Sequence, residues 1–236
     1  MLTSVKKSSS IKDLKAATNE RKSHMKKHVR LLSILLLVFS LLIGITAYAA
    51  SGSTTVFYWK EYMGEGTTSD INYSLKSAGY TSTRVSKSNT AGVLLAFRNK
   101  KVVHVYTHGL DGGGGILCSD NKWLKTSDMS GDFSGCKLIF LEICQGAKNS
   151  PTYGRVDAKC KTLGAKSTIA FTDDITAHSA FDGIHYFSKR VYYYLCSQAA
   201  PVSSAVSMAK FETYQRYGSY YGSDSCQTYG GDTKIR

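Results

Sequence analysis

The feature that most constrains the fold is a nearly continuous apolar segment from Lys137 to Ile143, with the sequence KLIFLEI. Its apolar residues stand at neighbouring positions, whereas a strand with one face in water alternates apolar and polar residues. A continuous apolar strand is typical of a sheet that is covered on both faces. The segment therefore predicts a buried central strand with other elements packed above and below it.

Segments typical of strands and helices alternate on both sides of this strand. Further strands are expected at Val56–Lys60, Thr81–Ser86, Lys101–Thr107 and Ser167–Thr172, and a hairpin at Ile116–Trp123. Helices are expected near Ser69–Ala78, Ala91–Arg98 and Tyr153–Leu163, over the helically spaced apolar residues from Phe181 to Leu195, and from about Pro201. This alternation predicts βαβ units and a mostly parallel sheet. Such sheets bind ligands beyond the carboxyl ends of their strands.

The N-terminal part of the chain has the pattern of a targeting segment. Residues 1–24 form a polar, basic extension, and Met25 can serve as a start. Basic residues then lead into an apolar run from Leu31 to Tyr48, which ends in Ala47-Tyr48-Ala49. A positive start, an apolar middle and small residues at an A-x-A site together predict a secretory signal peptide over residues 25–49.

The alternative is an uncleaved membrane anchor over residues 31–50, because about 20 uncharged apolar residues can span a bilayer. The Ala-Tyr-Ala site favours cleavage. Both interpretations place residues 51–236 outside the cytoplasm, secreted or at the cell surface, as a single domain.

Much of the positive charge belongs to the targeting segment. Of the 30 Lys and Arg residues 9 precede residue 51, as do 2 of the 17 acidic residues, so the remainder holds 21 basic and 15 acidic residues, a net charge of +6. This charge suits contact with an anionic bacterial cell wall or membrane surface. A nucleic-acid partner is not expected, because there is no basic stripe interleaved with aromatic residues and no zinc or helix-turn-helix pattern.

All six cysteines follow residue 51, at positions 118, 136, 144, 160, 196 and 226. An exported protein can form disulfides, but their spacing does not determine the pairing. No C-x-x-C motif occurs, so a zinc site is not expected. If Cys144 is kept free for chemistry, five cysteines remain and at least one other thiol stays unpaired.

Two apolar segments each end in a reactive side chain. The first, VVHVYTHG, ends in His108 and Gly109, and the second, LIFLEICQG, delivers Cys144 with Gly146 two residues later. Neighbouring parallel strands lie about 4.8 Å apart, so such strand ends bring the imidazole and the thiol to one crevice. Either motif alone is more often structural, as a buried cysteine or a turn. Their pairing at matching strand ends favours a catalytic dyad.

The chemistry of acyl transfer requires these residue types. A deprotonated thiol is strongly nucleophilic, and a neighbouring imidazole promotes the deprotonation and later protonates the leaving amine. Gly109 has no Cβ, so its N–H can approach a substrate carbonyl closely. Together with the N–H of Cys144 it is expected to form an oxyanion hole. The expected reaction requires no cofactor.

The two blocks resemble the signature of the peptidase clan that contains caspases, legumains, clostripain, gingipains and separases (clan CD). Glu142, two residues before the cysteine, resembles the legumain form, and Leu163 to Phe171 is similar to the caspase-like CHAT domains. The resemblance spans roughly residues 90–215. It implies a caspase-like three-layer α/β sandwich with a mostly parallel central sheet, and a cysteine endopeptidase that acts on peptide or protein substrates. Related enzymes sometimes use calcium, but no ligand cluster for it is visible.

The chain departs from this signature at Ile143, where Ala, Gly or Ser is usual before the cysteine. A β-branched side chain at this position is expected to crowd the site.

Acidic residues supply candidate substrate contacts. Asp173 and Asp174 follow the strand after the cysteine, where a carboxylate would receive a basic P1 residue, as in clostripain and gingipains; Glu142 is a third candidate. The alternative for the aspartates is helix capping, with Asp174 or Thr176 near the cap. Further acidic candidates beside the histidine loop are Asp111 and Asp120.

Other functions stay open. The main alternatives are an inactive caspase-like domain that serves as a binding module, and a cell-wall amidase. Papain-like and NlpC/P60-like hydrolases place cysteine before histidine, an order that a Cys144–His178 pair would restore. His104 is expected to be structural, and His185 to be packed or solvent-facing. The tail from Tyr214 to Tyr229 is either a substrate or wall-binding surface or, more simply, a loosely ordered end. The oligomeric state is left open.

Overall fold

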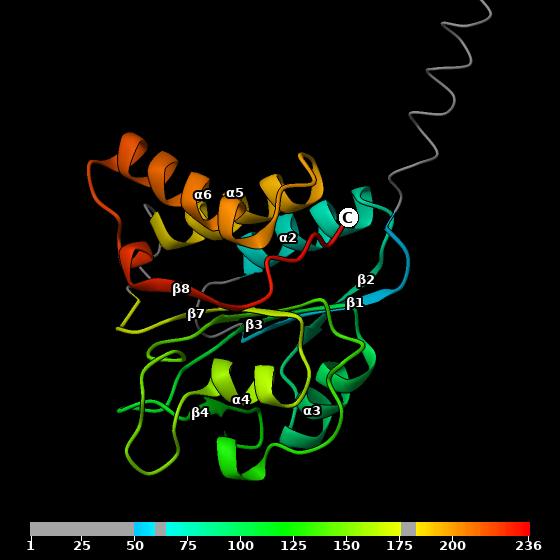
Figure 1. Cartoon of the computed structure of the whole chain (residues 1–236), viewed down its shortest axis with the longest axis vertical. Coiled ribbons are helices and arrows are strands. Elements are labelled where there is room, and N and C mark those ends of the chain that lie inside the picture. The colour runs from blue at the N-terminus through cyan, green and yellow to red at the C-terminus, as the bar shows by residue number, and fades with distance from the viewer. Residues whose placement is uncertain (1–49, 60–64, 176–182) are drawn as a thin grey trace, which may run out of the picture. The chain divides into compact units, whose positions relative to one another are not determined.

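The computed structural model describes residues 50–59, 65–175 and 183–236, which form a sheet with helices on both faces (Figure 1). The predicted extension at 1–24 and the signal peptide at 25–49 lie outside the described residues, as does the anchor alternative except for Ala50. None of the helices in the described ranges has the length and apolar character needed to cross a membrane.

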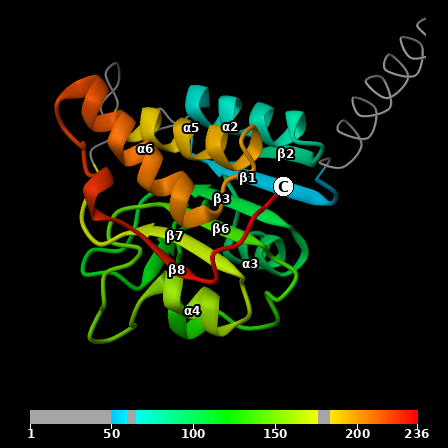
Figure 2. The same cartoon turned by 45° about the horizontal axis from the view of Figure 1, so that its top comes forward.

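Six strands form the central sheet in the order β2-β1-β3-β6-β7-β8 (Figure 2). The first five are parallel, and β8 runs antiparallel to β7. The strands span Ser53–Tyr58 (β1), Thr81–Ser86 (β2), Val102–Tyr106 (β3), Leu138–Glu142 (β6), Ser167–Phe171 (β7) and Cys226–Gly230 (β8). The predicted mostly parallel sheet is therefore confirmed, with the apolar segment from Lys137 as an inner strand.

Helices cover the sheet on both sides, as Figures 1 and 2 show. One face carries α2 (Glu65–Ser77), α5 (Gly183–Cys196) and α6 (Val202–Tyr217). The other carries α3 (Thr90–Asn99), α4 (Val156–Thr162) and the antiparallel hairpin of β4 (Gly115–Leu117) and β5 (Trp123–Lys125). The described residues also include two short 3-10 helices, η2 (Thr126–Asp128) and η3 (Ser223–Ser225). The three-layer α/β sandwich is thus confirmed.

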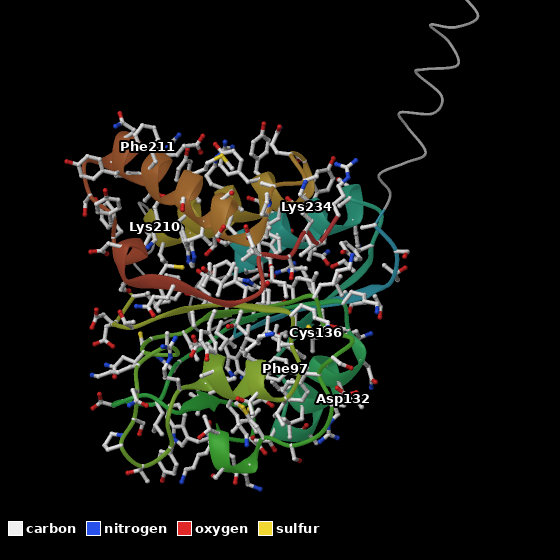
Figure 3. The ribbon with its side chains drawn as sticks, in the orientation of Figure 1. Phe97, Asp132, Cys136, Lys210, Phe211 and Lys234 are labelled. Atoms are coloured by element: carbon white, nitrogen blue, oxygen red, sulfur yellow. The ribbon has the colours of Figure 1, made fainter. Side chains whose placement is uncertain are left out.

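Alternation along the strands divides the interior into two cores. In β6, Leu138 and Phe140 pack in the core between the sheet and helices α5 and α6. Ile139 and Leu141 pack in the core on the other face, between the sheet and helices α3 and α4. Phe97 on α3 belongs to this second core and lies between the helix and the sheet (Figure 3). Both faces of β6 are fully buried, which explains its continuous apolar sequence.

The strand expected at Val56–Lys60 begins earlier, at Ser53, and two further expectations were wrong. The helix expected from Tyr153 begins at Val156, because Gly154 has a left-handed φ of +72° and closes a turn with its N–H on the Ser150 carbonyl, 2.7 Å away. The Tyr-rich tail is not loosely ordered. It continues α6, forms η3 and then adds β8 to the edge of the sheet.

All six cysteines are free thiols, and five of them are buried. Burial raises the pKa of Cys118, Cys136, Cys196 and Cys226 to about 12, and that of Cys160 higher still. Cys144 is the one cysteine with partial exposure. These five buried thiols are accordingly core residues with little nucleophilic character.

Candidate active site

The strand register brings the two predicted reactive segments together. β3 and β6 are neighbours, and Tyr106 pairs with Glu142. His108 and Cys144 each follow this pair by two residues, so both leave the same edge of the sheet from adjoining strands. A Cβ placed on Gly109 would lie 1.7 Å from the carbonyl oxygen of Cys144, so the two loop backbones are in direct contact. Glycine is required at 109 for this approach.

The Cys144 thiol is half-buried. Its S–H group donates a hydrogen bond to the carbonyl oxygen of Ile175, 3.7 Å away, in the segment that follows β7. Partial burial raises the pKa of this thiol, and the carboxylate of Asp174 raises it further. The resting side chain at neutral pH is therefore a neutral thiol, in contrast to the thiolate of an ion-paired dyad.

His108 is exposed, and its backbone is fixed by the neighbouring hairpin. The N–H of Leu117 donates to the His108 carbonyl over 3.0 Å, and Gly109 forms an isolated bridge with Ile116. The Thr107 hydroxyl donates to the Leu117 carbonyl over 3.2 Å. The hairpin therefore holds the strand end that presents His108 at the same edge of the sheet as Cys144.

Gln145 is a site residue that the sequence did not single out. Its N–H donates to the Asp173 carbonyl over 3.0 Å, and its side-chain oxygen accepts from the N–H of Gly112 over 2.8 Å. Its side-chain nitrogen donates to Asp174 Oδ1 over 2.8 Å. With φ of +56°, Gln145 adopts a left-handed conformation that is uncommon for a residue other than glycine. The residue after Cys144 thus fastens three loops to one another.

The glycines after the histidine let the loops pack closely. Gly113 has φ of +86°, and a Cβ on it would lie 2.6 Å from the Lys148 carbonyl oxygen. Gly114 is equally constrained, because a Cβ there would lie 2.4 Å from Cβ of Tyr153. The segments that follow β3 and β6 therefore form one packed unit around the site.

The two predicted aspartates have different surroundings. Asp173 is exposed, and its side chain accepts a hydrogen bond from the Thr172 hydroxyl over 3.2 Å. Asp174 is also exposed, but it bonds Gln145 and acts electrostatically on Cys144. The structure brings Asp174 to the thiol and directs the Asp173 carboxylate to its own loop. Thr176, part of the capping alternative, lies outside the described residues, as does His178.

Glu142 lies in the core, so a substrate contact by its side chain was a wrong expectation. Its carboxylate is fully buried and lies 3.1 Å from Nδ1 of His185 and 3.3 Å from Nε2 of His104. Burial by itself would raise the pKa of Glu142, but these two histidines outweigh it and lower the pKa to about 2. Glu142 is an ionised core residue, and its interactions with His104 and His185 connect β6 to β3 and to α5. His104 is structural and His185 is packed, as expected.

Ile143 does not enter the crevice. Its side chain is fully buried in the core below α3 and α4, on the opposite face from Glu142. A Cβ on Gly146 would lie 2.9 Å from Cγ1 of Ile143, so the glycine makes room for the branched side chain. The expected crowding of the site by Ile143 is therefore not found. Asp111 and Asp120 are both exposed.

Within the described ranges, no group of three or more His, Cys, Asp and Glu residues has the arrangement of a metal site.

Comparisons with known proteins identify the fold. No protein-family model and no curated protein sequence matches the chain. Among solved structures, the Arg-specific cysteine proteinase gingipain R superposes on 77% of this chain with a TM-score of 0.60 and 13% identity. Two structures of the Saccharomyces cerevisiae separase–securin complex superpose with TM-scores of 0.53 and 0.51 at 16% identity, over 78% and 77% of this chain.

The chain spans less than half of these neighbours, 46% of gingipain R and 12% of the separase chain. At such identities the likeness shows the fold, which is caspase-like.

Proposed function

We propose that the protein is a cysteine endopeptidase in which Cys144 is the nucleophile and His108 the general acid and base. The observation that carries this proposal is the in-register pairing of β3 and β6, with Gly109 in contact with the Cys144 backbone. The caspase-like fold, shared with the cysteine proteinase gingipain R, supports it. Cys144 is also the one cysteine that is partly exposed, whereas the other five are buried.

The reaction proceeds through a thioester. His108 takes the thiol proton as the sulfur attacks the carbonyl carbon of the scissile bond, and the N–H groups of Gly109 and Cys144 donate to the resulting oxyanion. The carbon–nitrogen bond breaks as His108 gives the proton to the leaving amine. A water molecule, deprotonated by His108, then hydrolyses the thioester, which releases the new carboxyl end and restores the thiol.

The raised pKa of Cys144 sets the order of these events. A neutral thiol in the resting site has to lose its proton during or after substrate binding. A cationic side chain that binds beside Asp174 would offset the negative charge that raises this pKa. Substrate binding and activation of the nucleophile are then coupled through Asp174.

Asp174 is proposed to receive a basic P1 side chain, Arg or Lys. One of its carboxylate oxygens accepts from Gln145, and the carboxylate is exposed and so accessible to a bound cation. The expected result is that Asp174→Asn lowers the ratio of kcat/KM for Arg over citrulline peptides about tenfold or more. Asp173→Asn is the matched control, and an unchanged ratio in Asp174→Asn would contradict this role.

The catalytic proposal is tested with fluorogenic peptides that carry Arg, Lys or Asp at P1. Cys144→Ala is expected to abolish cleavage, and His108→Ala to lower kcat/KM by roughly 10²–10⁴-fold. An alkylating Arg peptide should label Cys144 and fail to label the His108→Ala variant. Hydrolysis that survives Cys144→Ala would overturn the proposal.

The same experiment separates the alternatives. A protein that binds peptides but neither cleaves them nor reacts with the probe is a binding module. Release of peptides from purified peptidoglycan, without cleavage of linear peptides, would identify a cell-wall amidase.

The domain is further proposed to act outside the cytoplasm after cleavage of the signal peptide following Ala49. The signal pattern of residues 25–49 supports this. N-terminal sequencing of the secreted protein is expected to begin at Ala50. A full-length protein retained in the membrane fraction would favour the anchor over residues 31–50.

A further inference from the structure

The Tyr-rich segment that begins in α6 returns to the edge of the sheet where Cys144 lies. The end of α6, η3 and the start of α5 gather at this edge, on the left in Figures 1 and 2. A Cβ on Gly222 would lie 3.3 Å from the Asp174 carbonyl oxygen and 3.4 Å from Cα of Ile175. Ile175 in turn accepts the hydrogen bond of the Cys144 thiol. The segment therefore adjoins the candidate active site.

Five tyrosines and one arginine form a surface here, which we call the tyrosine shelf: Tyr186, Tyr214, Tyr217, Tyr220, Tyr221 and Arg216. Their rings pack in two groups. Tyr217 lies edge-on to Tyr186 and to Tyr221, with ring centroids 5.6 Å apart in both pairs, and Tyr214 stacks on Tyr220 at 4.8 Å. Tyr221 also covers Gly183, where a Cβ would lie 2.4 Å from its ring. The shelf is fixed to the first residue of α5.

The shelf keeps much of its aromatic surface open to solvent. Tyr214, Tyr220 and Tyr221 are 44%, 38% and 37% exposed. Tyrosines with restrained rings supply contact area at a low cost in conformational entropy, and their hydroxyl groups can hydrogen-bond at the rim. Such a surface is suited to apolar side chains of a ligand.

The one charged side chain among the six shelf residues is that of Arg216. Arg216 lies over the rings of Tyr186 and Tyr217, at 4.9 and 5.5 Å, and within the described part of the chain no carboxylate forms an ion pair with it. Arg216 also borders a pocket of about 450 Å³ between α2, α5 and α6. Three basic side chains and one acidic side chain line it, together with two tyrosines and a serine: Asp70, Tyr73, Ser74, Tyr186, Lys189, Arg190 and Arg216.

The other two basic residues of this pocket are already neutralised. Lys189 pairs with Asp70 over 2.7 Å, and Arg190 pairs with Glu212. Arg216 therefore carries the positive charge that is left for a ligand, next to apolar ring faces. A carboxylate that is flanked by an apolar or aromatic side chain matches this combination.

We propose that the tyrosine shelf is an extended substrate subsite that binds an acidic, aromatic-containing segment of the polypeptide chain being cleaved. This rests on the proposed peptidase function, and it adds a specificity remote from the scissile bond. A polypeptide occupant is favoured because Gly222, beside the shelf, packs against Ile175, which accepts the hydrogen bond of the thiol that would attack a peptide bond.

The test measures binding to the Cys144→Ala protein, so that it does not depend on catalysis. Fluorescent Arg-containing peptides are compared without extensions, with extensions that alternate Glu and Phe, and with extensions that alternate Lys and Phe. The Glu and Phe peptide is expected to bind about tenfold more tightly than the other two. Arg216→Gln and Tyr220→Ala should each remove most of this gain and leave the unextended peptide unaffected.

Phe211→Ala is the matched control, because Phe211 is 64% exposed on the outer surface of the same helix (Figure 3). Its Kd for every peptide should stay unchanged. Equal binding of the Glu and Lys peptides, or a full gain in Arg216→Gln, would overturn the proposal. Tight, Arg216-dependent binding of a poly(glycerol phosphate) polymer without binding of the acidic peptide would also overturn it.

Failure of the proposed peptidase function has a different signature. Wild-type protein that cleaves no peptide, while the Cys144→Ala protein shows the expected binding pattern, would remove the catalytic proposal and leave the shelf as a peptide-binding surface.

Discussion

The charge next to Cys144 decides when its thiol becomes reactive. Partial burial and the Asp174 carboxylate both raise the pKa of Cys144 above its ordinary value of 9.0. Asp174→Asn removes a negative charge that disfavours the thiolate, so the pKa is expected to fall and alkylation at pH 8 to accelerate. The rate of iodoacetamide labelling of Cys144, measured by mass spectrometry across a range of pH, gives the pKa of the thiol as the midpoint of the curve. Asp173→Asn should leave this midpoint unchanged. An unchanged or higher midpoint in Asp174→Asn would contradict the predicted effect of Asp174.

Glu142 provides a second prediction at the scale of single residues. The pKa of Glu142 is lower in the folded protein, about 2, than its ordinary value of 4.5. The ionised carboxylate therefore contributes its full stabilisation of the fold above pH 4.5, and this contribution is lost as the pH falls toward about 2. Glu142→Gln leaves two histidines without a carboxylate and is expected to cost about 3 kcal/mol of unfolding free energy at pH 6. In urea unfolding at pH 3, the difference in unfolding free energy between wild type and Glu142→Gln should be less than half of the difference at pH 6.

Glu65→Gln is the control for this measurement, because the Glu65 side chain is 55% exposed. An equal cost of Glu142→Gln at pH 3 and pH 6 would contradict an ionised Glu142 in the folded protein.

At the scale of elements, the site depends on how the segments after β3, β6 and β7 are joined. Gln145 connects these segments through its backbone N–H and both ends of its side-chain amide. Gln145→Ala is expected to lower kcat/KM roughly a hundredfold, because loops displaced by about 1 Å misalign the reacting groups. Fluorogenic peptide assays measure the effect, with Gln198→Ala as an exposed control. A loss of less than twofold would show that the loops hold their positions without Gln145.

At the scale of the whole molecule, the end of the chain completes the core. Ile235 is fully buried, and its carbonyl oxygen accepts hydrogen bonds from the Tyr80 hydroxyl and, over 3.1 Å, from Lys137 Nζ. Ile235→Ala is expected to lower the free energy of unfolding by about 2–4 kcal/mol through the cavity that it leaves. The neighbouring Lys234→Ala should change it by less than about 0.5 kcal/mol.

Thermal and urea unfolding check both variants. An Ile235→Ala protein as stable as wild type would show that the C-terminal segment does not belong to the cooperative core.

The sequence by itself determined the architecture and the common sheet edge at which His108 and Cys144 lie. Apolar periodicity is a local property, so the continuous apolar segment of β6 and the alternation of strands with helices were sufficient to predict a parallel, doubly covered sheet. The positions of His108 and Cys144 followed from the rule that parallel strands end at a common edge.

Tertiary structure decided everything that depends on contacts between distant segments. Glu142 lies two residues before Cys144, and only the packing of His104 and α5 shows that it is buried. No local sequence pattern marks Gln145 as a site residue, because its three hydrogen bonds join loops that are far apart along the chain. The tail became β8 and part of the shelf since the free edge of β7 offered it backbone partners, which its polar, tyrosine-rich composition does not reveal.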